Sequence, residues 1–210
     1  MRLLVTGFGP FPSMPRNPSA ALARAVASAP RWRLLGVSAE SRILTTAYAA
    51  LETELDPALA GKPDAVLMIG VAGRSRRIRV EGRATPRRSA LFADAAGVRA
   101  ERPEGSGVPS ERRSRFPPIR ALLALRREQV PARLSRDAGR YLCNAAYFRA
   151  LAGSAPTLFI HIPKPVTPRP RSSPCRRHLR QEESLAAALT MIATQLLLQA
   201  RRVASARRSG

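Results

Sequence analysis

A cysteine and a histidine are the two side chains whose types and positions suggest covalent chemistry. Cys143 follows the glycine-containing turn of residues 137–140 and precedes a short amphipathic segment, residues 144–151, that we predict to be a helix. The backbone N–H groups and the dipole at a helix start stabilise a thiolate, so we expect the pKa of Cys143 to be lowered. His161 lies near the end of an apolar run, residues 157–162, that reads as a buried strand. The pair could therefore act as nucleophile and general base.

Each of these two residues also has a purely structural interpretation. A free cysteine is among the most buried residue types, and a histidine at the end of a strand is often a hydrogen-bonded core residue. The position of His161 favours a functional role, because the active crevice of an open α/β sheet lies outside the carboxyl ends of its strands. The second histidine, His178, lies in a run of arginines and is predicted to be on the surface.

Glu81 is the candidate for a third member of this constellation. It closes a predicted strand, residues 76–80, and so could reach the same crevice as His161. A carboxylate there would orient the imidazole and stabilise its charged form. A surface ion pair with one of the many arginines is the alternative, and the local sequence alone favours that alternative.

Alternating strands and helices must position these residues. Asn17 is a good N-cap and Pro18 suits the first helical position, so a helix should begin there. The predicted strands are residues 3–5, 32–37, 65–69, 76–80, 130–134 and 157–162; the predicted helices are 18–27, 45–55, 119–128, 144–151 and 181–203. Leu122, Leu123 and Leu125 are expected to face inward. The pattern predicts an α/β fold with a mostly parallel core sheet.

The remaining segments are rich in arginine and proline. Residues 82–118 are expected to form a long surface loop, and residues 163–180 a basic loop. We expect one domain over residues 1–210, with a basic, flexible tail from about residue 204.

The chain is strongly basic, with a formal net charge of +22 carried almost wholly by arginine. Arginine fields attract phosphate, so a nucleic-acid partner is one interpretation. A solvated, arginine-rich surface is the other, and it is favoured because no aromatic residues are interleaved with the arginines.

Composition also bears on location. We expect no membrane span, because no run of about 18 apolar residues occurs. The N-terminal residues read as a first core strand, and the two cysteines, Cys143 and Cys175, make no disulfide framework. A cytoplasmic location is therefore expected.

Several motifs in order along the chain resemble the pyroglutamyl peptidase I family of cysteine peptidases. They are Val5-Thr6-Gly7-Phe8-Gly9-Pro10-Phe11, Asn17-Pro18-Ser19, Gly70-Val71-Ala72-Gly73 leading to Glu81, Asp94-Ala95-Ala96-Gly97, Ala138-Gly139-Arg140-Tyr141-Leu142-Cys143-Asn144 and Phe159-Ile160-His161-Ile162-Pro163. The resemblance implies a three-layer α/β/α sandwich with a mostly parallel, mixed central sheet, and no metal or cofactor. It implies hydrolysis of N-terminal pyroglutamyl residues from peptides through a thioester, with Cys143 as nucleophile, His161 as general base and Glu81 as orienting acid.

The same resemblance implies where the substrate binds. Phe8 and Phe11 fall on the aromatic positions that hold the flat lactam ring, Asn17 on the Asn-Pro-Ser segment, and Leu142 beside the nucleophile. A neutral lactam suits apolar faces with a few backbone hydrogen bonds. The expected partners are pyroglutamyl peptides and, as in other members of the family, further copies of the chain in a homo-oligomer.

Two positions in the segment after Glu81 depart from the family pattern. Pro86 stands where an asparagine is usual, and Leu91 where the family has an arginine implicated in stabilising the oxyanion. Arg87 or Arg88 could substitute from nearby. Two alternatives to an active peptidase therefore stay open: a degenerate, weakly active or inactive relative, and a basic nucleic-acid-binding protein on the same fold.

Overall fold

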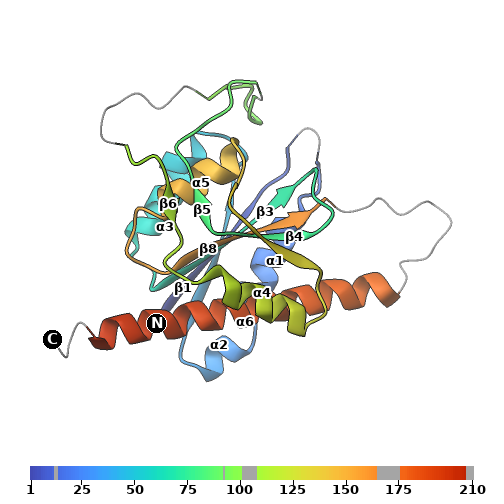
Figure 1. Cartoon of the computed structure of the whole chain (residues 1–210), viewed down its shortest axis with the longest axis vertical. Helices are drawn as coiled ribbons and strands as arrows, with labels where there is room; N and C mark the ends of the chain where they lie inside the picture. The colour runs from blue at the N-terminus through green and yellow to red at the C-terminus, as the bar shows by residue number, and fades with distance from the viewer. Residues whose placement is uncertain (12–13, 92, 101–107, 165–175, 207–210) are drawn as a thin grey trace.

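The protein folds around one mixed, six-stranded sheet, seen in the computed structural model of the chain (Figure 1). The structure describes residues 1–11, 14–91, 93–100, 108–164 and 176–206. The strand order is β2 (Ser38–Leu44), β1 (Arg2–Phe8), β3 (Ala65–Ala72), β8 (Thr157–Pro163), β4 (Ile78–Glu81) and β7 (Ala132–Ser135). The first four strands are parallel, whereas β4 runs antiparallel to β8 and β7 is parallel to β4. The predicted mostly parallel, mixed sheet is confirmed.

Helices cover both faces of the sheet and complete a three-layer α/β/α sandwich (Figure 1). One face packs against α1 (Pro18–Ala27), α4 (Pro118–Arg127) and α6 (Arg176–Ala206), with the short α2 (Arg31–Leu34) beside them. The other face packs against the π-helical turn η1 (Leu51–Leu55), α3 (Asp56–Ala60) and α5 (Leu142–Ala150). The strands β3 and β8 are buried on both faces, which explains their unbroken apolar sequences.

Local signals place several elements where the sequence predicts them. The Asn17 side chain accepts a hydrogen bond from the Ser19 N–H at 3.1 Å, and Pro18 begins α1. The prediction of a strand over residues 32–37 is wrong, because Trp32 lies in α2 and donates its indole N–H to the Val26 carbonyl. The strand begins instead at Ser38, where half-exposed and exposed residues alternate along the sheet edge.

Other boundaries differ because tertiary packing decides them. The helix predicted over residues 45–55 begins only after a turn, as η1 followed by α3. On α4, Leu122 and Leu125 are buried as expected, but Leu123 is 49% exposed and so was wrongly assigned to the core. Within residues 82–118, β5 (Arg83–Ala84) and β6 (Arg112–Arg113) form a small antiparallel sheet.

Helix α6 spans the molecule beneath the central sheet (Figure 1). By length and composition alone, residues 181–206 are apolar enough to cross a membrane. Leu189, Ile192 and Leu196 are buried against the sheet, so packing inside the domain accounts for the apolar face of this helix. The predicted tail is helical through Ala206, and residues 207–210 lie outside the described residues.

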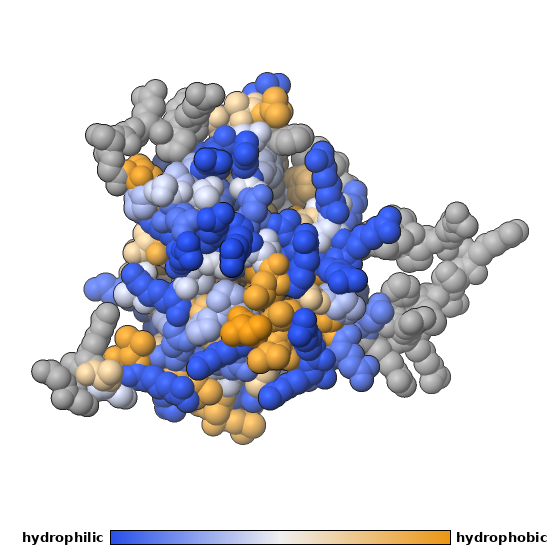
Figure 2. Space-filling model, in the orientation of Figure 1, coloured by the Kyte–Doolittle hydropathy of each residue, from blue (hydrophilic) through white to orange (hydrophobic). Residues whose placement is uncertain are grey.

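The surface agrees with the basic composition. Figure 2 shows hydrophilic side chains over most of one face, interrupted by an apolar patch over α4. Helix α4 carries the exposed side chains Ile119 and Leu123.

Candidate active site

Strand pairing brings the predicted catalytic residues to one face of the sheet. In the parallel pair of β3 and β8, Gly70 is the register partner of His161. In the antiparallel pair of β4 and β8, Arg79 is the partner of His161 and Glu81 the partner of Phe159. Register partners share a face, and so do residues two apart on a strand. Glu81 and His161 therefore both face α5, which packs on this side.

Glu81 and His161 form a buried hydrogen bond. The His161 Nδ1–H donates to Glu81 Oε1 at 2.8 Å, and the glutamate is fully buried. An ionised carboxylate can only accept, so the hydrogen sits on Nδ1 and the other nitrogen, Nε2, is free to act as a base. The ring also packs against Phe159, with 4.7 Å between centroids. The predicted carboxylate–imidazole pair is thus formed. An arginine also pairs with Glu81, but the carboxylate is buried and the pair does not lie on the surface.

Arg79 balances the buried charge of Glu81. Its Nε lies 3.0 Å from the same Oε1 atom that binds His161. Its guanidinium also donates to Ser135 Oγ at 2.9 Å and to the Asp137 carbonyl, which ties β4 to the segment leading into α5. The Tyr147 hydroxyl on α5 donates to the Glu81 carbonyl at 2.9 Å. The acid is therefore held through both its side chain and its backbone.

Cys143 is the second residue of α5, as the predicted helix start requires. The chain turns into this helix at Gly139, whose φ of +88° is in the left-handed region that favours glycine. The sulfur lies over β3: a Cβ built on Gly70 would be 3.0 Å from Cys143 Sγ and 2.7 Å from Phe159 Cζ. The missing side chain of Gly70 therefore makes room for the thiol, and Gly70 is the register partner of His161.

The expected lowering of the thiol pKa is wrong for the resting site. Loss of hydration, together with the negative charge of Glu81, raises the pKa of Cys143 to about 12. The backbone N–H at the helix start acts in the opposite direction but is outweighed. The thiol is therefore protonated at neutral pH, and its attack requires a base to take the proton.

Asn144 is a buried residue of the site that the sequence analysis did not single out. Its side-chain NH₂ donates to the carbonyls of Thr85 at 2.7 Å and Arg87 at 3.0 Å, and its oxygen accepts from the Thr85 N–H at 3.0 Å. These bonds fasten the segment after Glu81 to the first turn of α5. A polar residue next to the nucleophile in an otherwise apolar helix was the available signal.

The predicted substrate-binding residues differ in their surroundings. Phe8 is buried against Phe159, with 6.3 Å between ring centroids, and Leu142, the first residue of α5, is also buried. Phe11 is half-buried and forms an isolated bridge with Met14. Asn17 donates from Nδ2 to the Gly9 carbonyl at 3.0 Å, so this side chain holds the loop that carries both phenylalanines.

The two departures from the family pattern lie on the segment fastened by Asn144. Pro86 stands between the two residues that Asn144 binds, and Leu91 is 78% exposed. Arg87 and Arg88 are both exposed, and the Arg88 guanidinium lies 5.7 Å from the centroid of the Tyr48 ring. Leu91 therefore makes no buried contact at the site.

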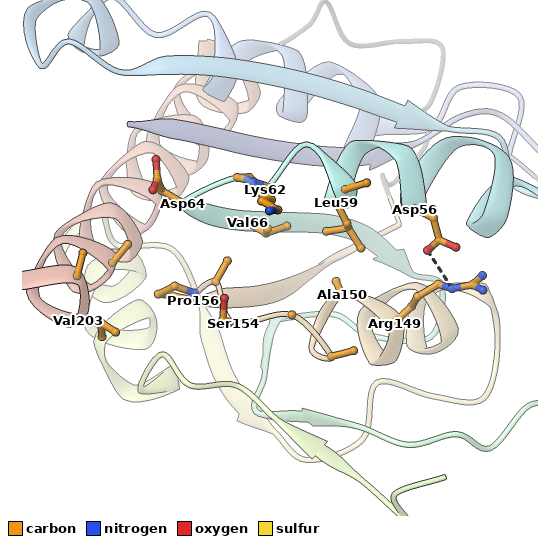
Figure 3. Close-up of a pocket in the computed structure, with 17 residues that line it drawn as sticks. Asp56, Leu59, Lys62, Asp64, Val66, Arg149, Ala150, Ser154, Pro156 and Val203 are labelled. Atoms are coloured by element: carbon orange, nitrogen blue, oxygen red, sulfur yellow. Dashed lines mark ion pairs between the residues drawn. The ribbon is translucent and has the colours of Figure 1, made fainter. Parts of the chain in front are cut away.

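A cavity of about 870 Å³ lies at the other end of the sheet (Figure 3). It is lined by residues that precede β3 and β8, such as Lys62 and Pro156, and by the ion pair of Arg149 Nε with Asp56 Oδ1 at 3.0 Å. None of the predicted site residues lines it. Among the described residues, no group of three or more His, Cys, Asp or Glu side chains could hold a metal ion.

Comparison with known proteins gives one consistent result. The model of the pyroglutamyl peptidase family matches residues 1–168. The pyrrolidone-carboxylate peptidase of Thermococcus kodakarensis is 34% identical over 172 residues, which covers 78% of this chain and 81% of that protein. The solved pyroglutamyl peptidase I of Bacillus amyloliquefaciens superimposes with a TM-score of 0.73 at 25% identity, covering 92% of this chain and 97% of the other. The pyrrolidone carboxyl peptidase structure from Thermus thermophilus gives 0.71 at 28% identity, covering 90% and 98%.

Proposed function

The chain belongs to the pyroglutamyl peptidase family of cysteine peptidases, and we propose that Cys143, His161 and Glu81 carry out its reaction. That reaction is the hydrolytic removal of an N-terminal pyroglutamyl residue from a peptide. The observation that supports the assignment is the 2.8 Å hydrogen bond between Glu81 and His161. The Cys143 sulfur lies over Gly70, which is the register partner of His161.

The first half of the reaction transfers the pyroglutamyl group to the enzyme. His161 Nε2 takes the thiol proton as Cys143 Sγ attacks the pyroglutamyl carbonyl, and Glu81 stabilises the imidazolium that forms. The tetrahedral intermediate collapses, the C–N bond breaks, and the departing amine takes the proton from His161. A thioester on Cys143 and a free peptide amine are the products of this half.

The second half releases the acid. His161 Nε2 takes a proton from water, and the resulting hydroxide equivalent attacks the thioester carbonyl. The C–S bond breaks, pyroglutamate leaves, and the sulfur regains its proton from the imidazolium. His161 Nε2 thus accepts and delivers one proton in each half, first from the thiol to the departing amine and then from water to the sulfur.

Backbone N–H groups at the start of α5 are placed to stabilise the oxyanion. The N-cap residue Tyr141 makes no side-chain cap hydrogen bond, so the first-turn donors of the helix are not taken up by a cap. One such donor contributes roughly 3 kcal/mol to lowering the barrier in other acyl-transfer enzymes. These donors would supply the stabilisation that the family pattern assigns to the position of Leu91.

The lactam ring is proposed to bind beside the loop after β1. Phe11 offers a half-buried apolar face, while Phe8 and Leu142 form the packed base beneath the site. Asn17 contributes by holding Gly9, and so by fixing the loop. A homo-oligomer, a cytoplasmic location and a nucleic-acid partner stay predictions that rest on resemblance or on composition.

Hydrolysis of pyroglutamyl-aminocoumarin tests this assignment directly. The wild type should release the fluorophore, Cys143→Ala should not, and circular dichroism should show that both are folded. Cys175→Ala is the matched control and should keep activity, because the proposal assigns no role to the second cysteine. A fully active Cys143→Ala variant would exclude Cys143 as nucleophile.

A further inference from the structure

Tyr48 packs against the same hydrophobic cluster as Cys143 and carries a buried hydroxyl. The residue lies in the turn between β2 and η1. Its neighbour Thr46 donates from Oγ1 to the Gly9 carbonyl at 3.0 Å, so this turn packs against the loop that carries Phe8 and Phe11. Its hydroxyl oxygen is buried and has no hydrogen-bond partner among the residues that the structure describes.

The rest of Tyr48 is fixed in place from several sides. Its backbone N–H donates to Asp94 Oδ2 at 2.7 Å, and its ring packs edge-on against Tyr141, with 6.0 Å between centroids. The Tyr141 hydroxyl in turn donates to the Ala93 carbonyl at 2.9 Å. Arg88 covers the Tyr48 ring. The hydroxyl is therefore held in one place without a hydrogen-bond partner in the described part of the chain.

Buried polar groups in proteins almost always have a hydrogen-bond partner, so an exception at the rim of a catalytic site points to a ligand. The ring of Tyr48 contacts Tyr141, the N-cap residue of α5, so Tyr48 lies at the end of the helix that carries Cys143. Burial and the neighbouring Tyr141 raise the pKa of Tyr48 to about 12, so the hydroxyl keeps its proton and is available as a donor. The complementary group on a substrate is a carbonyl oxygen.

The pyroglutamyl residue offers two carbonyls, the scissile one and that of the lactam. The scissile oxygen is the one that we assign to the backbone N–H groups of α5. The turn that carries Tyr48 packs instead against the loop after β1, where the lactam ring is proposed to bind. We propose that the Tyr48 hydroxyl donates a hydrogen bond to the lactam carbonyl of the bound substrate, an inference that rests on the function proposed above.

This role would give the enzyme its selectivity for a lactam. A five-membered ring without the carbonyl would leave the Tyr48 hydroxyl buried and unpaired, which costs binding free energy. Phe11 would recognise the flat ring, and Tyr48 its oxygen.

The test is the Tyr48→Phe variant, probed with pyroglutamyl-aminocoumarin and with 2-pyrrolidone, the lactam ring alone, as a competitive inhibitor. We expect the inhibition constant of 2-pyrrolidone and the KM of the substrate each to rise about tenfold, with a smaller change in kcat. The melting temperature should stay the same or rise, because the variant removes a buried hydroxyl that the fold leaves unpaired.

Tyr141→Phe is the matched comparison, since its hydroxyl does have a protein partner. Tyr141→Phe should lower the melting temperature, whereas Tyr48→Phe should keep or raise it. Unchanged inhibition by 2-pyrrolidone in Tyr48→Phe would overturn the proposal, and so would a fall in melting temperature without a change in that inhibition. Alkylation of Cys143 by iodoacetamide should inactivate both the wild type and Tyr48→Phe; if it inactivates neither, the proposed function fails instead.

Discussion

Arg79 and His161 are register partners across the antiparallel strands β4 and β8, and both contact the same oxygen atom, Oε1 of Glu81. The guanidinium and the imidazole therefore share one buried negative charge. The division of that charge sets how readily His161 holds the proton it takes from Cys143.

Arg79→Gln should destabilise the fold, because it removes the charged partner of a buried carboxylate. The variant loses the contact of Nε with Glu81 Oε1 and the bonds to Ser135 and Asp137. We expect the free energy of unfolding in urea to fall by about 3–5 kcal/mol. Arg77→Gln, at an exposed position on the same segment, is the control and should leave the free energy of unfolding unchanged. An unchanged value in Arg79→Gln would show that Arg79 does not stabilise the buried acid.

Gly70→Ala should damage both stability and catalysis. The new methyl group would lie 2.7 Å from Phe159 and 3.0 Å from the Cys143 sulfur, so one or both must move. We expect the free energy of unfolding in urea to fall by about 1–3 kcal/mol. Displacement of the nucleophile should lower kcat/KM by about 10²-fold.

Gly73→Ala is the matched control for Gly70→Ala. It changes the same residue type three positions further along the chain, and a methyl group there would meet nothing within 4 Å. Equal effects of the two substitutions would refute the steric explanation.

The alkylation of Cys143 by iodoacetamide should have the pH dependence of a thiol with a raised pKa. Burial and the charge of Glu81 raise that pKa to about 12, so the thiolate fraction should keep increasing above pH 9. In Cys175→Ala, which carries a single cysteine, the rate should climb about tenfold per pH unit up to pH 10, whereas a free thiol levels off near its ordinary pKa of about 8.5. A plateau near pH 6–7 would instead indicate a thiolate–imidazolium pair in the resting enzyme.

Asn144→Ala should loosen the arginine-rich segment after Glu81. The variant loses three hydrogen bonds and leaves backbone groups of Thr85 and Arg87 without partners. We expect a loss of about 2–4 kcal/mol in the free energy of unfolding. Trypsin should cleave after Arg87 and Arg88 faster than in the wild type. Gln199→Ala, which gives up a single amide-to-carbonyl bond to Arg115, should not change the cleavage rate at these sites.

The sequence predicts best those structural features that are determined by residues close together in the chain. Asn17 and Pro18 define the start of α1 by themselves, and the apolar runs of β3 and β8 allow only buried elements. The order of motifs was enough to predict the pairing of Glu81 with His161, which lie 80 residues apart in the chain.

Features that depend on packing were not predictable in the same way. Trp32 sits in a short helix because its indole reaches Val26, a contact that no local pattern reports. The pKa of Cys143 follows from burial and from Glu81, both supplied by distant segments, and these outweigh the helix start that the sequence did reveal. Tyr48 stood in no motif, and Asn144 stood in one without a role of its own, since the importance of both residues comes from what surrounds them.

The reversed direction of β4 has a consequence for proton exchange with solvent. Because β4 runs against β8, its last residue, Glu81, pairs with Phe159, two positions deeper in the sheet than His161. The carboxylate is fully buried below the imidazole, which is itself only 4% exposed. Substrate and water therefore exchange protons with His161, while Glu81 stays out of their reach beneath the ring.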